Sequence, residues 1–389
     1  MVTDRTAGGA TGIPGDIQAW LCGVLVPFWA KAVADPARPG FIELLRPDFS
    51  PDPGARRTTL VTARLIHVFS HAHCLDPAGP GLAAARHGLG FLLDVCRGPD
   101  GRFRHVVTTS GEVIDGRADL YDLAFVLFGL GWYARASGDR SVLAIADDVA
   151  RFIETRLAHP KGGFAEDTLG TLPRRQNPHM HLLEAFLLLA EIAPDKPWLA
   201  RATAMIDLMR AHFFDAETGS LGEFFTWDWR PAEGLAGEIR EPGHHFEWCW
   251  LIHHYARLSG DRGVLDMADR LFAFGRAHGL AAMPAGAALD EVDRAGRPIK
   301  PSMLLWPQTE LLKALTARLE FGRDDKQGPA IDQVLAVIFG RYVDAGTGRW
   351  RNQLDASGAP VMADIPVRVL YHLMFALAEL ARVRTATGA

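Results

Sequence analysis

Histidines and other polar side chains interrupt six strongly apolar stretches of this 389-residue sequence. Burying polar groups that have no function is costly, so their repeated placement indicates a site inside the fold. In chain order these residues are Arg64; Tyr121 and Asp122; Asn177, His179 and His181; His244, His245 and Glu247; Trp306, Gln308 and Glu310; Arg368 and His372. Histidine takes and gives protons near neutral pH. The set therefore predicts a site for proton transfer.

Each of these residues also has a purely structural interpretation. A single histidine in an apolar helix is commonly a hydrogen-bonded core residue. His181 and Glu184 stand three residues apart on one helical face, and so do His244 and Glu247. Each pair is either a local contact at a helix start or a carboxylate that fixes a histidine tautomer. No catalytic role is expected for the neighbouring His245, His253 and His254.

Arg64 points to function more directly, because an uncompensated guanidinium is rarely buried. We expect it to face a wet cavity. No metal and no cofactor are expected, since His179 and His181 are two residues apart and face different directions on a helix. The sequence has no HExxH, P-loop or GxSxG motif, and the glycines near Gly79 and Gly81 do not follow a strand.

Helices of two kinds would hold the candidate residues. A helix that is apolar all round must be buried, whereas an amphipathic helix covers a core. The buried set is expected at about 57–74, 118–136, 178–192, 244–258, 303–319 and 366–383, and the covering set at about 14–33, 80–97, 140–157, 197–213, 262–278 and 328–343. The candidate residues lie near the starts of the buried helices. Those starts meet at one rim if the buried helices run parallel.

Glycine turns repeat along the chain with a period of about 60 residues. A glycine followed closely by an apolar residue recurs at Gly40, Gly101, Gly162, Gly219 and Gly348, and a degenerate copy is expected near Gly296. Six such units predict an all-α fold, an (α/α)6 barrel of six inner and six outer helices, with an open helical solenoid as the alternative. We expect one catalytic domain over residues 1–389, in which 1–12 form a flexible segment.

Composition excludes several classes of function. The formal net charge is −5 and no run of Lys and Arg occurs, which argues against nucleic acid and anionic membrane surfaces as partners. No stretch is apolar enough for a membrane span, and the first residues lack the pattern of a signal peptide. Cys22, Cys74, Cys96 and Cys249 form no CxxC pair and are expected to be reduced. These features predict a cytoplasmic protein, monomeric or homodimeric, that acts on a small molecule.

Taken together, the motifs resemble the N-acylglucosamine 2-epimerase superfamily, which includes mannose isomerases, cellobiose 2-epimerases and sulfoquinovose isomerases. The matching strings are the helix with Arg64, NPHMHLLEA (177–185), GHHFEW (243–248), WPQTE (306–310) and YHL (371–373). The resemblance implies an (α/α)6 barrel with His244 and His372 as the principal acid–base pair and His181 assisting ring opening. It implies that the sugar is held by Arg64, Tyr121, Asn177, Glu247, Trp306, Gln308 and Arg368.

The first expectation is cofactor-independent isomerisation of an aldose to a ketose, D-mannose to D-fructose, through a cis-enediolate. Returning the proton to the opposite face of C2 would instead make the enzyme a 2-epimerase acting on mannose, cellobiose or an N-acylated hexosamine. A glycoside hydrolase would need two flanking carboxylates, for which Asp122, Glu247 and Glu310 are candidates. A non-catalytic helical scaffold is the fourth alternative. Because Arg64 and Arg368 can each bind either a hydroxyl or an anion, a phosphorylated or sulfonated sugar is an alternative substrate.

Overall fold

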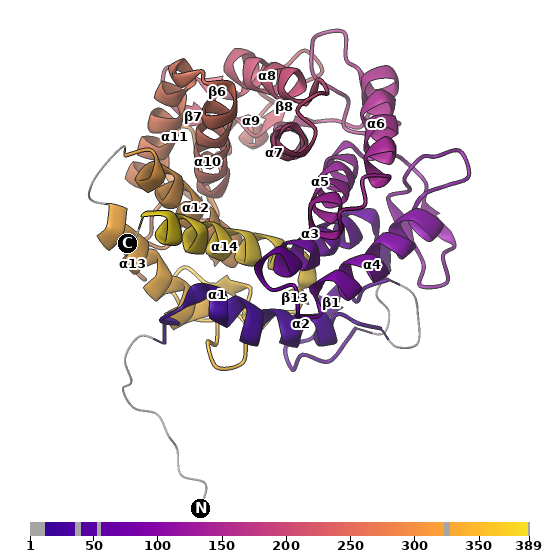
Figure 1. The fold of residues 1–389 in the computed structure, drawn as a ribbon. Coiled ribbons are helices and arrows are strands. Elements are labelled where there is room, and N and C mark those ends of the chain that lie inside the picture. Colours follow the sequence, from indigo (N-terminus) through magenta and orange to yellow (C-terminus); the bar gives the residue numbers. More distant parts are fainter. Residues whose placement is uncertain (1–11, 36–39, 53–55, 323–326, 388–389) are drawn as a thin grey trace, which may run out of the picture.

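The helices form two concentric rings in the computed structural model, which describes residues 12–35, 40–52, 56–322 and 327–387 (Figure 1). The inner ring contains α3 (Thr59–Leu75), α5 (Leu120–Ser137), α7 (Asn177–Ile192), α10 (Pro242–Ser259), α12 (Leu305–Glu320) and α14 (Leu370–Thr387). The outer ring contains α1 (Ile17–Trp20) with α2 (Val26–Ala32), then α4 (Gly81–Phe91), α6 (Val142–Phe152), α8 (Trp198–Leu208), α11 (Leu265–His278) and α13 (Gln327–Val337). The predicted inner and outer helices are confirmed to within a few residues at each end.

Burial follows the two kinds of helix as predicted. In α6 the buried residues are Val142, Leu143, Ala146, Val149 and Ala150, a single stripe that faces the inner ring. In α5, by contrast, nearly every residue from Leu120 to Ala134 is buried, because the helix has neighbours on all sides. Most outer helices contain or run into a five-residue π-helical turn; these turns span Leu21–Leu25, Leu92–Cys96, Ile153–Leu157, Met209–Phe213 and Ile338–Tyr342.

Short antiparallel strands join the loops that lead into neighbouring inner helices. The pairs are β2 (Arg57–Thr58) with β3 (Val106–Val107), β5 (Arg174–Arg175) with β8 (Phe224–Phe225), β11 (Met303–Leu304) with β12 (Gln353–Leu354), and β1 (Leu44–Leu45) with β13 (Ile365–Pro366). Single bridges, Asp119 to Asp167 and Arg240 to Val292, connect the remaining neighbours. The sequence analysis did not expect these strands, because a two-residue strand is too short to show alternation.

The pairing of β1 with β13 ties the last unit to the first. Helix α3 accordingly contacts both α5 and α14, and the side chain of Arg64 donates to the backbone oxygen of Arg368 over 3.4 Å. These contacts close the ring and exclude the open solenoid. Five further short strands complete the loops. Strand β4 (Val113–Asp115) extends the β2–β3 sheet, β6 (Phe214–Asp215) pairs with β7 (Ser220–Leu221), and β9 (Glu291–Val292) pairs with β10 (Pro298–Lys300).

The glycine turns follow the outer helices, with one correction to the predicted repeat. After Gly101, Gly162 and Gly348, the residue two positions on pairs with the chain leaving the outer helix, as in the bridge of Ala158 to Phe164. In the fifth unit the same geometry belongs to Gly286, whose φ is +83° and which precedes the bridge of Leu280 to Ala288. Gly296 lies instead in the turn between β9 and β10. The repeat was misassigned because an alanine stands where the other units carry a large apolar residue.

Two predictions concern the chain as a whole. The predicted flexible segment 1–12 falls, apart from Gly12, outside the described residues. Among the helices of the described ranges, none has the length and apolar character required to cross a bilayer.

Candidate active site

A cavity of about 280 Å³ opens where the inner helices begin, and all six of them contribute to its wall. Nine of the ten predicted site residues line it: Arg64 of α3, Tyr121 of α5, Asn177 and His181 of α7, His244 and Glu247 of α10, Trp306 of α12, Arg368 in the turn just before α14, and His372 in the first turn of α14. We call it the central cavity. Because the helices start there, the positive ends of their dipoles face its contents.

His372 forms a buried dyad with a carboxylate from the neighbouring helix. Its Nδ1 lies 2.7 Å from Oε1 of Glu310, so Nδ1–H donates to the carboxylate and Nε2 is left for a ligand. Burial lowers the pKa of His372 well below its usual value, and the charges of Arg64 and Lys313 lower it further. The imidazole is therefore neutral at pH 7 and can accept a proton through Nε2.

His244 has the opposite charge state. Its Nδ1 lies 2.9 Å from Oε2 of Glu223 and 3.6 Å from Oε2 of Glu241. Burial alone would lower the pKa of His244, but these two carboxylates raise it to about 10. His244 is therefore an imidazolium at pH 7, and Nε2–H is left to donate. The predicted pairing with Glu247 is wrong, since the partner is Glu223 from the loop before α10.

His181 is held by the carboxylate three residues further along its helix. Nδ1 of His181 lies 3.0 Å from Oε2 of Glu184, and the hydroxyl of Tyr371 donates to the same carboxylate over 2.6 Å. Burial lowers the pKa of His181 well below its usual value, so it is neutral at pH 7. The local pairing predicted from the spacing is present, and a second helix, α14, reinforces it.

Arg64 faces the cavity as predicted. Its Nη2 donates to the hydroxyl of Tyr121 over 2.7 Å, and its guanidinium packs over the rings of Phe125 and Tyr371. The indole of Trp306 contacts both catalytic candidates on this wall, with ring centroids 5.0 Å from His244 and 5.6 Å from His372. The buried side-chain oxygen of Asn177 has no partner in the described part of the chain, so it is available to a bound molecule.

Gln308 is the one predicted site residue that the structure does not bring to the cavity. Its amide accepts from the backbone nitrogen of Ala288 and donates to the backbone oxygens of Ala288 and Leu304. It therefore fastens the loop of the fifth unit to α12. The difference arises because Gln308 lies two residues after Trp306, which places the two side chains on different faces of the helix.

His179 and His245 have matching structural roles. Nε2 of His179 accepts from the backbone nitrogen of Phe164, and Nε2 of His245 accepts from that of Leu221. Both acceptors hold the hairpin of a glycine turn against the start of an inner helix. The prediction that His179 and His181 face different directions is confirmed by these contacts.

A group of buried acids lies beneath the histidines. Glu184, Glu247 and Glu310 are at most 2 % exposed, and the ammonium of Lys313 lies 2.8 Å from Glu310 and 3.7 Å from Glu247. These acids form metal-ligand-like groups with His181 and His372. In both groups the Lys313 ammonium already supplies a positive charge at the carboxylates. That no metal takes part in the reaction stays a proposal.

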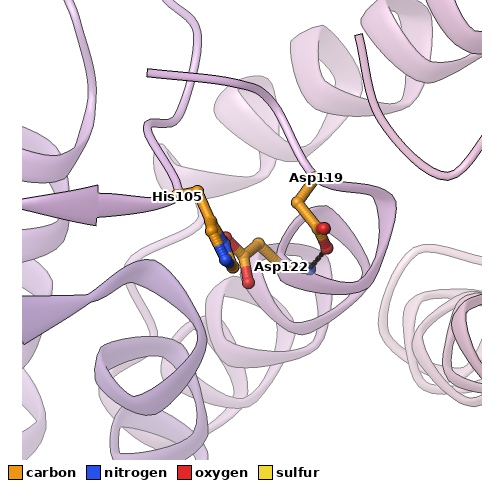
Figure 2. A group of neighbouring side chains, drawn as sticks. All are labelled: His105, Asp119 and Asp122. Atoms are coloured by element: carbon orange, nitrogen blue, oxygen red, sulfur yellow. Dashed lines mark hydrogen bonds and ion pairs between the residues drawn. The ribbon is translucent and has the colours of Figure 1, made fainter. Parts of the chain in front are cut away.

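Asp122, a predicted mouth residue, faces away from the central cavity. Its Oδ2 lies 2.7 Å from Nδ1 of His105, and Asp119 caps the same helix by accepting from the backbone nitrogens of Tyr121 and Asp122 (Figure 2). His105 lines a neighbouring side cavity of about 950 Å³, which shares Pro366 and Arg368 with the central cavity. Burial raises the pKa of Asp122 to about 7, and the hydrogen bond to Asp122 raises the pKa of His105.

Several functional candidates escaped the sequence analysis. Arg175, Glu241 and Asn352 line the central cavity, while Glu223 and Lys313 support it from behind. Glu223, Glu241 and Asn352 lie in loops outside any apolar helix, so the search of helix starts did not reach them. Lys313 carried a signal that could have been used, because a lysine inside an apolar helix needs a buried partner.

Comparisons with known proteins agree with the family that the sequence motifs resemble. The family model described as N-acylglucosamine 2-epimerase (GlcNAc 2-epimerase) matches residues 40–376. The mannose-6-phosphate isomerase of Rhizobium meliloti (strain 1021) is 33 % identical over 94 % of this chain and 96 % of its own length. The D-mannose isomerase of Pseudomonas cannabina pv. alisalensis is 29 % identical over 79 % of this chain and 78 % of its own. Cellobiose 2-epimerase from Bacillus thermoamylovorans B4167 superimposes with a TM-score of 0.85 at 22 % identity, covering 94 % of this chain and 98 % of its own.

Proposed function

Because this chain belongs to the N-acylglucosamine 2-epimerase family and is a sugar isomerase or 2-epimerase, we propose that it interconverts an aldose and a ketose, with D-mannose and D-fructose as the preferred pair. The reaction needs neither cofactor nor metal in this proposal. The enzyme would work in the cytoplasm as a monomer or homodimer, without nucleic acid or membrane as a partner.

The observation that carries the proposal is the opposite charge state of two histidines on one cavity wall. His372 is neutral because it is buried, and His244 is protonated because Glu223 and Glu241 stabilise its charge. Two groups of one type whose pKa values are pushed apart are suited to the roles of base and acid. We therefore assign His372 as the carbon base and His244 as the acid that serves the oxygen atoms.

The proposed steps move one proton between carbon atoms. After ring opening, in which His181 assists, Nε2 of His372 takes the proton from C2 of the aldose. The C–H electrons form the C1=C2 bond, and O1 receives the proton from Nε2 of His244. His244, now neutral, takes the proton from O2 as the C2 carbonyl forms, and His372 returns its proton to C1. Arg64 and the helix dipoles stabilise the enediolate charge.

Other activities fit the site less well. A 2-epimerase would return the proton to C2 from the opposite face. Because cellobiose 2-epimerases are among the relatives of this chain, the test below also measures that product. The central cavity, about 280 Å³, lies just below the usual range of about 300–1,000 Å³ and fits a single sugar ring, whereas a disaccharide would have to extend into the adjoining side cavity. An inverting hydrolase would need two free carboxylates beside the bond. Of its three candidates, Glu247 lines the central cavity, whereas Glu310 is held by His372 and Lys313, and Asp122 by His105.

A second candidate substrate is the same hexose carrying a phosphate. Arg368 is exposed at the junction of the central and side cavities, and its guanidinium makes no ion pair with any carboxylate in the described ranges. Arg117 also lines the side cavity, but it is paired with Asp115 and Asp167. An arginine without a carboxylate partner suits a phosphate, which it can bind through two parallel hydrogen bonds. The relative named mannose-6-phosphate isomerase agrees with this candidate.

The test of the first candidate is incubation of EDTA-treated protein with D-mannose in D2O, followed by NMR of the products. D-Fructose carrying deuterium at C1 is expected, and His372→Ala should abolish its formation while the far-UV circular dichroism spectrum is retained. D-Glucose carrying deuterium at C2 would replace the isomerase by the epimerase. Formation of fructose that disappears after EDTA treatment would contradict the metal-free mechanism.

Arg368→Met separates the two substrates. If a phosphate binds Arg368, the variant should lose at least about 10-fold in kcat/KM for mannose 6-phosphate while kcat/KM for mannose changes little, since an ion-pair hydrogen bond contributes about 1.5–3 kcal/mol. The measurement is a steady-state assay of both sugars with both proteins. Equal losses for the two sugars would assign Arg368 to a hydroxyl and remove the phosphorylated candidate.

A further inference from the structure

Lys313 is the most deeply buried cation near the site, and the reaction steps above do not use it. It lies on α12, one helical turn below Glu310, and is 0 % exposed. Its ammonium packs over the ring of Trp250 at 4.4 Å and that of Phe375 at 4.9 Å. Burial alone would lower the pKa of Lys313, but Glu310, Glu247 and Glu184 raise it above its usual value. A charged lysine in an apolar layer therefore needs these acids.

The same acids support the catalytic histidines. Glu310 accepts from His372, and Glu184 accepts from His181 and Tyr371. Burial and the charge of Glu247 raise the pKa of Glu310 well above its usual value, and the charge of Lys313, whose ammonium lies 2.8 Å from the carboxylate, limits that rise. For Glu184 the effect of burial is likewise opposed by Lys313. The ammonium is thus a positive charge shared by both dyads.

The charge of Lys313 matters because of what Glu310 does for His372. An ionised Glu310 accepts Nδ1–H and leaves the lone pair of Nε2 for the substrate. A protonated Glu310 would donate to Nδ1 instead, which would place the proton on Nε2 and remove the base. The dyad therefore depends on keeping a buried carboxylate charged.

We propose that Lys313 is a positioning residue, whose ammonium keeps Glu310 ionised and thereby holds His372 in the tautomer with a free Nε2. Lys313 does not touch the substrate in this proposal, and its catalytic consequence rests on the proposed function. Its consequence for the His372 tautomer does not, and can be measured without a substrate.

The test compares Lys313→Met, Glu310→Gln and the double variant. We expect Lys313→Met to lower kcat about 10- to 100-fold with little change in KM, the usual effect of removing a group that supports a catalytic residue from behind. The acid limb of the pH profile should move to higher pH, because Glu310 then ionises only at higher pH. If Lys313 acts through Glu310, the double variant should be no slower than Glu310→Gln alone. Losses that multiply would overturn the proposal.

The second readout is the tautomer of His372, measured by 1H–15N NMR of histidine-labelled protein without sugar. We expect Lys313→Met, or Lys313→Gln if the methionine variant does not fold, to move the proton from Nδ1 towards Nε2. An unchanged tautomer together with an unchanged pH profile would refute the role of Lys313, whatever the enzyme turns over. Arg318→Met is the matched control: Arg318 lies on the same helix but pairs with Asp269 of α11, so kcat should not change.

Discussion

Three histidines of one cavity differ in charge because their carboxylate partners differ in number and in neutralisation. His372 and His181 each have one principal acid, and Lys313 offsets the charge of both acids. His244 has Glu223 and Glu241 nearby. The surplus negative charge around His244 keeps it protonated, so local charge balance assigns acid and base among residues of one type.

Glu223→Gln tests this assignment at the residue scale. Removing one carboxylate should lower the pKa of His244 from about 10, so the basic limb of the kcat profile should move to lower pH. The stability from the pair is fully present below the unfolded pKa, about 6.5, and is lost as pH rises towards about 10. Wild type should therefore lose more stability over that window than the variant, in which Glu241 still raises the pKa of His244. A basic limb at the same pH in both proteins would contradict the assignment of His244.

At the scale of elements, each outer helix is followed by a glycine hairpin, after which the chain runs towards the cavity. Two of these hairpins are fastened by histidines at inner-helix starts, namely His179 and His245. In the fifth unit Gln308 replaces the histidine and holds the backbone of Ala288 instead. The two wrong predictions for this unit therefore have one origin. The fifth unit has its turn glycine at Gly286 instead of Gly296, and its hairpin is held by Gln308, which was predicted to contact the sugar.

Gly286→Ala should destabilise the protein by about 1–2 kcal/mol, because φ is +83° there and an alanine is strained in that conformation. Urea unfolding measures the change. Gly340→Ala is the control: it lies in the helical turn Ile338–Tyr342 and a Cβ meets nothing within 4 Å, so stability should stay equal or rise by about 0.5–1 kcal/mol. If Gly286→Ala were as stable as Gly340→Ala, the hairpin assignment of the fifth unit would be wrong.

At the scale of the molecule, the first outer helix closes the ring against the last loop. The indole of Trp29 stacks on Trp350 at 3.8 Å and donates to the backbone oxygen of Gly348, while Trp20 donates to that of Ala345. These contacts join residues more than 300 positions apart. They act together with the β1–β13 pair, which joins the same two ends of the chain.

Trp29→Ala should cost about 3–5 kcal/mol in the free energy of unfolding, since it removes a large side chain that is 0 % exposed. Because Trp29 does not line the central cavity, kcat per folded molecule should remain near that of the wild type. Chemical denaturation and a steady-state assay give the two quantities. A large loss of kcat without a loss of stability would show that ring closure and the cavity are coupled.

The sequence by itself determined the helices, their two rings and nine of the residues that line the central cavity. Periodicity fixes which face of a helix is buried, and glycine turns mark where each unit ends, so local pattern was sufficient for these. It also brought His181 together with Glu184, because residues three apart lie on the same face of an α-helix. Only the tertiary structure decided that Glu223 rather than Glu247 holds His244, that Gln308 serves a loop, and that Lys313 balances acids from three helices. Those contacts join distant segments, and the charge state of a buried group depends on all its neighbours in space, which no local pattern records.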